Sequence, residues 1–177
     1  PREKRMEATM EDVLARLRRL EDLEAIRHTW RDYCIRLDSE DWTGLGDVYT
    51  EDAVLEMDGL GPLAPGLDGT YRGRRTIIDD FYRASIGEAS ENRSFLTGHL
   101  STNMQIDLKG DEATTLAYFF EIVANNLVLI GTYQHRFRRE PDRWRFAFLR
   151  ISIRYAARIE ASGLSGQPLI DILAKPV

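Results

Sequence analysis

The stretch S-T-N-M-Q-I-D-L-K-G-D-E-A-T-T-L-A-Y-F-F-E-I-V at residues 101–123 decides the fold class of this chain. In its first part Thr102, Met104, Ile106 and Leu108 alternate with polar residues, which is the period of a half-buried β-strand. The K-G-D sequence at 109–111 is typical of a hairpin turn, and residues 113–123 predict a second long strand. The stretch therefore predicts an antiparallel pair of strands.

The segments on either side extend this pair into a domain. Downstream, residues 127–138 and 143–157 predict two further strands. Upstream, apolar residues recur every three or four positions over 11–37 and predict a long helix. A short helix at 42–49, capped by Ser39 or Asp41, a strand at 53–57 and a helix at 74–86 follow. Helices followed by an antiparallel meander predict an α+β fold in which the helices cover one face of a curved sheet.

Length and composition limit the organisation and the class of partner. We expect one domain at 11–160, a disordered segment at 1–10 and a tail at 161–177 that packs on the domain. The loop at 58–70 is rich in Gly and Pro, which is typical of a lid or binding segment. The net charge of -5 disfavours a general nucleic-acid binder. Without a signal-like or membrane-spanning stretch, the chain is expected to be cytoplasmic.

Cys34 is the only cysteine, which excludes an intramolecular disulfide. A small buried apolar residue is the favoured interpretation of it, ahead of a nucleophile. His28 is interpreted as a surface residue and His135 as a hydrogen-bonded sheet residue. The histidines lack metal-ligand spacing and no phosphate-binding glycine motif is present, so we expect neither a metal nor a cofactor.

Asp38 and His99 are the strongest candidates for chemistry. Asp38 ends the long helix within D-S-E-D-W, and His99 begins a strand within T-G-H-L-S-T-N. A carboxylate and an imidazole that meet in an apolar cavity can transfer protons near neutral pH. An acid at a helix C-terminus is disfavoured by about 0.3–1 kcal/mol, so something must compensate for Asp38. Two alternatives stay open, in which Asp38 caps the next turn and His99 is structural on a polar strand face.

The last strand carries a second group of candidates. Arg150, Ser152 and Arg154 fall on the same face as Trp144, Phe146 and Phe148 if the alternation is regular. A few polar groups among aromatic rings are typical of the wall of a small-molecule cavity. Alternatively the arginines leave the core at the strand end and extend into solvent.

These motifs resemble those of a known superfamily. The element pattern resembles the cone-shaped fold of nuclear transport factor 2 (NTF2) and its SnoaL-like relatives. D-S-E-D-W-T-G-L at 38–45 resembles the aspartate segment of scytalone dehydratase, and G-H-L-S-T-N at 98–103 resembles the histidine strand of hexachlorocyclohexane dehydrochlorinase. I-R-Y at 153–155 resembles the arginine-bearing end of both enzymes. The resemblance covers roughly residues 11–158.

The resemblance implies roles for several residues. His99 would be the base, Asp38 would orient it, and Arg154 would bind or polarise the substrate. Tyr33 would donate a hydrogen bond and stands where the dehydrochlorinase has a lysine, which disfavours halide elimination. The residues expected to contact the substrate are Trp42, Asn103, Tyr133, Phe148 and Arg150.

The sequence thus predicts a cofactor-independent lyase or isomerase of the dehydratase, β-elimination or cyclase type. It would act on a small, mostly apolar and possibly cyclic substrate through Asp38 and His99, as a homo-oligomer (dimer or trimer). Two alternatives stay open: a non-catalytic small-molecule-binding or oligomerisation domain, and a subunit that resembles the structural small subunit of aromatic-ring dioxygenases.

Overall fold

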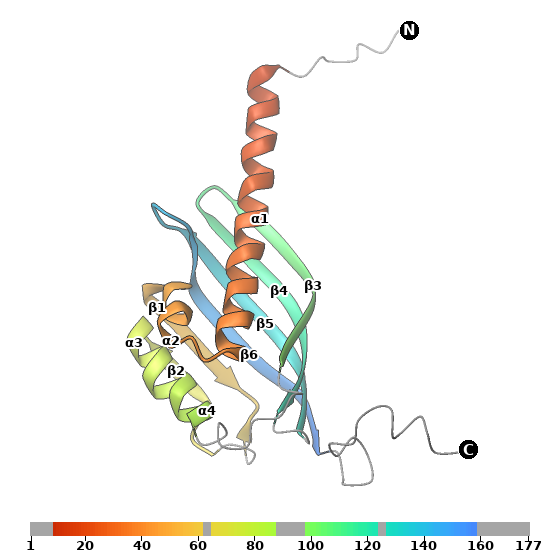
Figure 1. Ribbon diagram of the computed structural model, residues 1–177. Helices are drawn as coiled ribbons and strands as arrows, with labels where there is room; N and C mark the ends of the chain where they lie inside the picture. The colour runs from red at the N-terminus through yellow and green to blue at the C-terminus, as the bar shows by residue number, and fades with distance from the viewer. Residues whose placement is uncertain (1–8, 62–64, 88–97, 124–126, 159–177) are drawn as a thin grey trace, which may run out of the picture.

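The computed structural model describes residues 9–61, 65–87, 98–123 and 127–158, so most of the predicted N-terminal segment and the tail at 161–177 lie outside the described residues. Figure 1 shows helices followed by a long meander of strands. The elements are α1 (Met10–Asp38), α2 (Trp42–Asp47), β1 (Tyr49–Asp58), β2 (Gly69–Arg72), α3 (Arg74–Thr76), the π-helix η2 (Ile77–Arg83), α4 (Ala84–Gly87), β3 (Gly98–Lys109), β4 (Glu112–Val123), β5 (Leu127–Arg139) and β6 (Trp144–Arg158).

The long helix α1 forms where the sequence predicts it. Thr9 begins it with a capping box, in which Thr9 and Asp12 each bond the backbone N–H of the other. Ile26, Trp30, Tyr33 and Leu37 then follow one another on its buried face. Asp41 caps α2 by accepting a hydrogen bond from the Gly44 N–H at 2.9 Å. The chain therefore turns sharply just after Asp38.

The sheet has six strands in the order β2-β1-β6-β5-β4-β3. β3 to β6 form the predicted antiparallel meander, but β1 runs parallel to β6, with Leu55 opposite Leu149. The sheet is therefore mixed, and the expectation of a purely antiparallel sheet is wrong at this one pair. The short strand β2 pairs with β1 and was not predicted, because its Gly-rich surroundings are typical of a loop.

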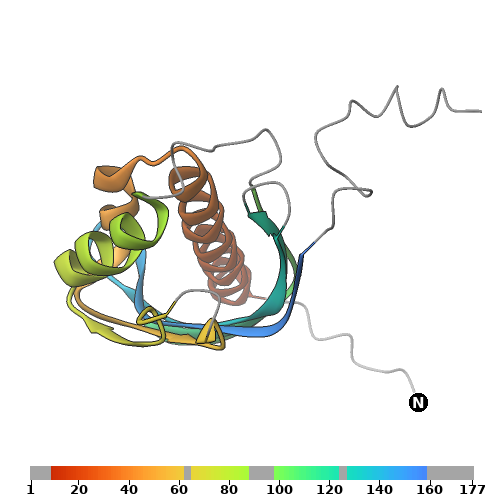
Figure 2. The same ribbon diagram turned by 90° about the horizontal axis from the view of Figure 1, so that it is seen from below.

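The sheet curves around α1, as Figure 2 shows from below, with α2, α3 and α4 on one side of α1 and β3 and β4 on the other. The single helix predicted at 74–86 is instead divided by the π-helix η2. Between the helices and the sheet lies an aromatic core, in which the rings of Trp30 and Tyr33 stack 5.0 Å apart and Tyr133 meets Trp30 edge-on. The predicted arrangement of helices covering one face of a curved sheet is confirmed.

Bulges in two strands change which side chains face this interior. The β3–β4 register shifts between Thr102 and Gln105, and Asn103 adopts a φ of 55°. After the bulge in the chain, the even-numbered residues Met104 and Leu108 pack inward. Before the bulge, Leu100 is 61% exposed and the odd-numbered His99 points inward. An extra residue reverses the alternation of a strand. The bulge therefore brings His99 to the concave side.

Strand β6 has two such irregularities. Phe137 pairs with Phe146 and Arg136 with Phe148, so Ala147 is an extra residue. Gly131 pairs with Ile153 and Ile130 with Tyr155, so Arg154 is a second one. As a result Phe146, Leu149 and Ile151 face the interior, although their numbering does not follow a single alternation.

Candidate functional site

A cavity of about 280 Å³ lies between α1, η2 and the concave face of the sheet. Its apolar wall includes Leu37, Met57, Phe81, Phe119, Leu129 and Ile151. Its polar groups are Tyr33, Tyr82, Ser85, His99, Glu121 and Tyr133. Leu60 and Leu67 of the predicted 58–70 loop also line it. A mostly apolar cavity with a few convergent polar groups is typical of a small-molecule site.

Asp38 and His99 are in direct contact at one side of this cavity. The Asp38 Oδ1 atom lies 2.6 Å from His99 Nδ1, and Oδ2 accepts a hydrogen bond from the His99 backbone N–H at 3.2 Å. Asp38 itself does not line the cavity, so it contacts the His99 ring on the side that faces away from the cavity. Because Nδ1 is bonded to a carboxylate, the ring presents Nε2 to the cavity. These contacts offset the unfavourable interaction of the Asp38 carboxylate with the C-terminal end of the α1 dipole.

Glu121 completes the group and was not predicted. It lies directly opposite His99 across the β3–β4 pair, and its Oε1 atom is 3.6 Å from His99 Nε2. The side chains are 15% and 10% exposed, respectively. Alternation along β4 places Glu121 after Ala117 and Phe119 on the buried face. A carboxylate at an apolar position is the sequence signal that could have revealed it.

The surroundings perturb both titrating groups. Burial lowers the pKa of His99, but the carboxylates of Glu121 and Asp38 outweigh it, and the net pKa is raised above its ordinary value. Burial raises the pKa of Glu121; the nearby His99 opposes this and Asp38 reinforces it. The pair therefore favours the retention of a proton between Nε2 and the Glu121 carboxyl. Perturbed groups in a cavity are typical of sites that move protons.

Three tyrosine hydroxyls form a buried hydrogen-bonded chain beside the pair. The Tyr82 hydroxyl donates to that of Tyr33 at 3.1 Å and lies 2.8 Å from that of Tyr49, which therefore donates to it. Burial raises the pKa of Tyr133, Glu121 adds to this, and a hydrogen bond from Tyr33 partly offsets it. The chain thus leads to Tyr133, which lines the cavity and whose hydroxyl stays protonated because its pKa is raised. Such a hydroxyl can donate to an oxygen that gains negative charge.

Arg154 is outside this cavity. It is the extra residue of the second β6 bulge and is exposed, so it cannot contribute the cationic group that the sequence predicted. Arg150 also faces outward, where it pairs with Glu56 and its guanidinium lies 6.0 Å from the Phe148 ring centroid. Both placements correct the prediction of one cavity-lining face, which assumed an unbroken alternation along the strand.

Three other predicted contact residues also lie away from the cavity. Phe148 lies beyond the Ala147 bulge on the outer face, with the Arg136 guanidinium 5.6 Å from its ring centroid. Asn103 is exposed and forms the β3 bulge. Trp42 packs against the core from α2, with Arg83 5.9 Å from its ring centroid. Of the predicted set, Tyr33, His99 and Tyr133 line the cavity, and Asp38 supports His99.

The remaining candidates behave as buried structural groups. Burial raises the pKa of the Cys34 thiol to about 12, and the Asp38 charge adds to this, so the thiol stays protonated near neutral pH. Burial lowers the pKa of His135 to about 3, and its Nδ1 contacts the Thr115 hydroxyl. Within the described residues no group of three or more His, Cys, Asp or Glu side chains is arranged to hold a metal ion.

Comparison with known proteins identifies the family. Residues 18–150 match the SnoaL-like domain, so the chain belongs to the SnoaL-like family. An NTF2-like protein with a cystatin-like fold from Novosphingobium aromaticivorans is similar in structure, with 23% identity, a TM-score of 0.63 and coverage of 95% of this chain and 98% of that one. Among curated proteins none matches.

Hexachlorocyclohexane dehydrochlorinases are also similar in structure. LinA-type3 from Novosphingobium barchaimii LL02 has 20% identity and a TM-score of 0.67 over 86% of this chain and 98% of that one. The Type2 enzyme has 21% identity and a TM-score of 0.63, with coverage of 86% and 97%. At these identities the likeness establishes the fold. No helix in the described ranges is long and apolar enough to cross a membrane.

Proposed function

We propose that this protein is a cofactor-independent lyase or isomerase that removes a proton from carbon next to an activating group of a small apolar substrate. The observation that supports this is the 2.6 Å contact between Asp38 and His99, with the other ring nitrogen directed toward an apolar cavity. Asp38 holds the ring in the tautomer whose Nε2 accepts a proton, which is the arrangement of a general base.

The tyrosine chain supplies the second requirement of such a reaction. Removal of the proton develops negative charge on the oxygen of the activating group, and a fixed hydroxyl donor stabilises that charge. Tyr33 and Tyr133 both line the cavity, and because the Tyr33 hydroxyl donates to Tyr133, the Tyr133 hydroxyl is the one that can donate to a substrate. Tyr133 takes the part that the sequence assigned to Arg154. The similarity in structure to hexachlorocyclohexane dehydrochlorinases adds support for elimination chemistry.

Exchange of the α-hydrogens of cyclohexanone in D2O, followed by NMR, tests the proposal without knowledge of the natural substrate. A His99→Gln variant should lose about 10²–10⁴-fold in exchange rate if His99 is the base. His28→Gln is the matched control, since the side chain of His28 is 62% exposed and remote from the cavity. Equal rates for the wild type and His99→Gln would contradict the proposal.

The alternative is a non-catalytic binding domain of the same fold. It predicts that cyclic ketones bind in the cavity without hydrogen exchange. A binding site has no need of a carboxylate behind the ring and a second one in front of it, because both cost desolvation. The Asp38–His99–Glu121 arrangement therefore favours the enzyme.

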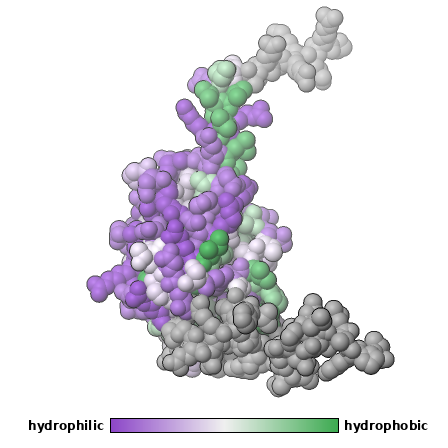
Figure 3. All heavy atoms as spheres, viewed as in Figure 1, coloured by the Kyte–Doolittle hydropathy of each residue, from purple (hydrophilic) through white to green (hydrophobic). Residues whose placement is uncertain are grey.

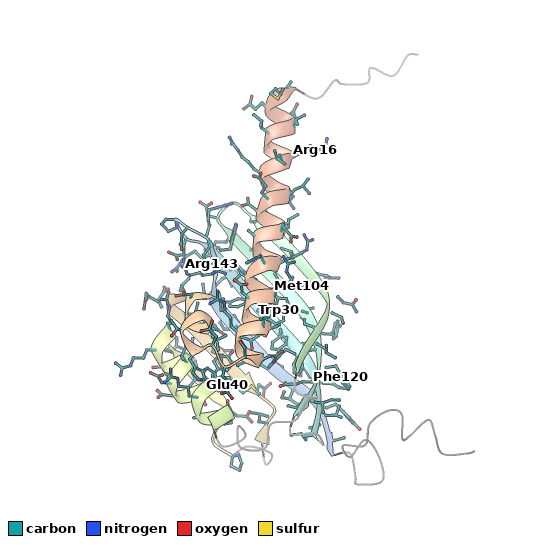
Figure 4. All side chains as sticks on the ribbon, viewed as in Figure 1. Arg16, Trp30, Glu40, Met104, Phe120 and Arg143 are labelled. Atoms are coloured by element: carbon teal, nitrogen blue, oxygen red, sulfur yellow. The ribbon has the colours of Figure 1, made fainter. Side chains whose placement is uncertain are left out.

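We further propose that the protein is a homo-oligomer. Figure 3 shows apolar side chains on the projecting N-terminal half of α1, where Met10, Val13, Leu17 and Leu20 are 47–74% exposed. On the outer face of the sheet Tyr118, Phe120 and Tyr155 are also exposed, and Figure 4 shows Phe120 directed away from α1. Exposed apolar patches of this kind are typical of subunit contacts. Light scattering of the purified protein distinguishes monomer, dimer and trimer.

The cytoplasmic location stays a prediction.

A further inference from the structure

The proposed function assigns no step of the reaction to Glu121, yet this residue faces the same space as the base. Its carboxyl lies 3.6 Å from His99 Nε2, slightly beyond a direct hydrogen bond, and both side chains line the cavity. The other ring nitrogen is already bonded to Asp38. A substrate that brings its reacting carbon to Nε2 therefore also comes within reach of the Glu121 carboxyl.

Charge and burial determine how this pair holds its proton. Two ionised carboxylates beside a neutral ring would be costly in a cavity where Glu121 is only 15% exposed. One proton on either Nε2 or the Glu121 carboxyl removes that cost. With the proton on the carboxyl, Nε2 is a free base and Glu121 an acid on the same side of the substrate. The raised pKa of Glu121, which follows first from burial, agrees with this form.

We propose that Glu121 is the general acid that protonates a leaving oxygen, so that the site dehydrates neutral β-hydroxy carbonyl compounds. This inference rests on the proposed function, since it requires His99 as the base. His99 Nε2 takes the proton from the α-carbon, the carbon–carbon double bond forms, and the β carbon–oxygen bond breaks. The proton of Glu121 goes to the departing oxygen, which leaves as water. Transfer of the proton from Nε2 to the Glu121 carboxylate then restores the starting state.

The nature of the leaving group follows from the same geometry. A hydroxyl leaves poorly unless an acid protonates it, whereas chloride leaves as a stable anion without one. A buried acid beside the base is therefore useful for loss of water and unnecessary for loss of halide. With Glu121 protonated, the group of Asp38, His99 and Glu121 still carries the negative charge of Asp38, which favours a neutral substrate over an anionic one.

A pair of probes that differ only in the leaving group tests the assignment. The wild type should convert 3-hydroxycyclohexanone and 3-chlorocyclohexanone to the same enone. Glu121→Gln should lower the rate of water loss relative to the rate of chloride loss by about 10²-fold or more, because any change in His99 affects both rates and cancels in their ratio. Glu121→Asp retains an acid on a shorter arm and should restore part of the water loss. Glu112→Gln, an exposed change on the same strand, is the matched control.

The outcomes separate this inference from the proposed function. If Glu121→Gln slows both eliminations equally, Glu121 acts through His99 and the acid assignment is overturned. The same holds if the wild type exchanges α-hydrogens of cyclohexanone but does not release water from the hydroxy probe. If the wild type does not exchange α-hydrogens, the proposed function fails and this inference fails with it. Thermal unfolding of each variant verifies that it is folded.

Discussion

The contact between Asp38 and His99 has an energy that a double-mutant cycle can measure. In the cycle, Asp38→Ala, His99→Ala and the double variant are compared with the wild type by urea unfolding. The hydrogen bond from the His99 backbone N–H to Asp38 Oδ2 is lost with Asp38 whichever side chain stands at position 99, so it cancels. The coupling energy therefore reports the 2.6 Å contact with the ring.

A hydrogen bond to a charged group contributes about 1.5–3 kcal/mol, and the Asp38 carboxylate also attracts the positive charge of a protonated His99 ring. The pKa of His99 is raised above its ordinary value of 6.5, so the folded state holds the ring proton more tightly. This stabilisation is fully present below pH 6.5 and is lost as the pH rises through the raised pKa. We therefore expect a coupling of about 1.5–3 kcal/mol near pH 6 that decreases near pH 9.

The exposed pair of His28 and Asp32 is the control for this cycle. Its atoms lie 3.5 Å apart, the His28 side chain is 62% exposed, and its coupling should stay below about 0.5 kcal/mol. A coupling between Asp38 and His99 no larger than that of the control, at both pH values, would refute the reasoning. The ring would then be held by packing, and Asp38 would have no orienting role.

Three further predictions follow from other contacts. Burial raises the pKa of Glu121, so its ionisation opposes folding as the pH rises above 4.5. The melting temperature of Glu121→Gln minus that of the wild type should therefore increase with pH. A difference that does not change with pH would contradict this. Asn103 has a φ of 55°, so Asn103→Val should cost about 1–2 kcal/mol while Asn103→Gly stays close to the wild type in urea unfolding; equal stability of the two variants would contradict it. A Cβ at Gly131 would lie 2.1 Å from the Ser152 carbonyl oxygen and 2.6 Å from the Phe119 ring. Gly131→Ala should therefore lower the free energy of unfolding by about 1–3 kcal/mol. An unchanged midpoint in urea unfolding would contradict the packing described.

The sequence predicted the order of elements well because those elements follow their own local patterns. The helical period of α1 and the alternation of β3 to β6 are strong over long segments, and their bounds differ from the prediction by only a few residues. Parallel pairing of β1 with β6 could not be predicted, because it joins segments far apart in the chain. Strand β2 has only four residues and no apolar alternation to mark it.

For the site, the sequence identified several of the residues but did not predict which face of the sheet their side chains occupy. Asp38, His99, Tyr33 and Tyr133 gather at one cavity, but Phe148, Arg150 and Arg154 face elsewhere because two extra residues interrupt β6. The same effect at Asn103 brings His99 inward and opposite Glu121. A bulge depends on how two strands pair, so a single strand pattern cannot reveal it. Glu121 was not predicted because its contact with His99 depends on how β3 and β4 pair.

The parallel pairing of β1 with β6 also has a consequence for how the protein folds. Strands β3 to β6 follow one another closely in the chain and can pair early, while β1 must wait for its partner β6, the last of the described strands. His99 and Glu121 belong to one early hairpin, whereas Tyr33, Met57 and Tyr82 come from the segments that close over it. The cavity therefore exists only once the segments that line it, from α1 to β6, have come together. A ligand that fills it should accordingly slow unfolding more than it speeds folding.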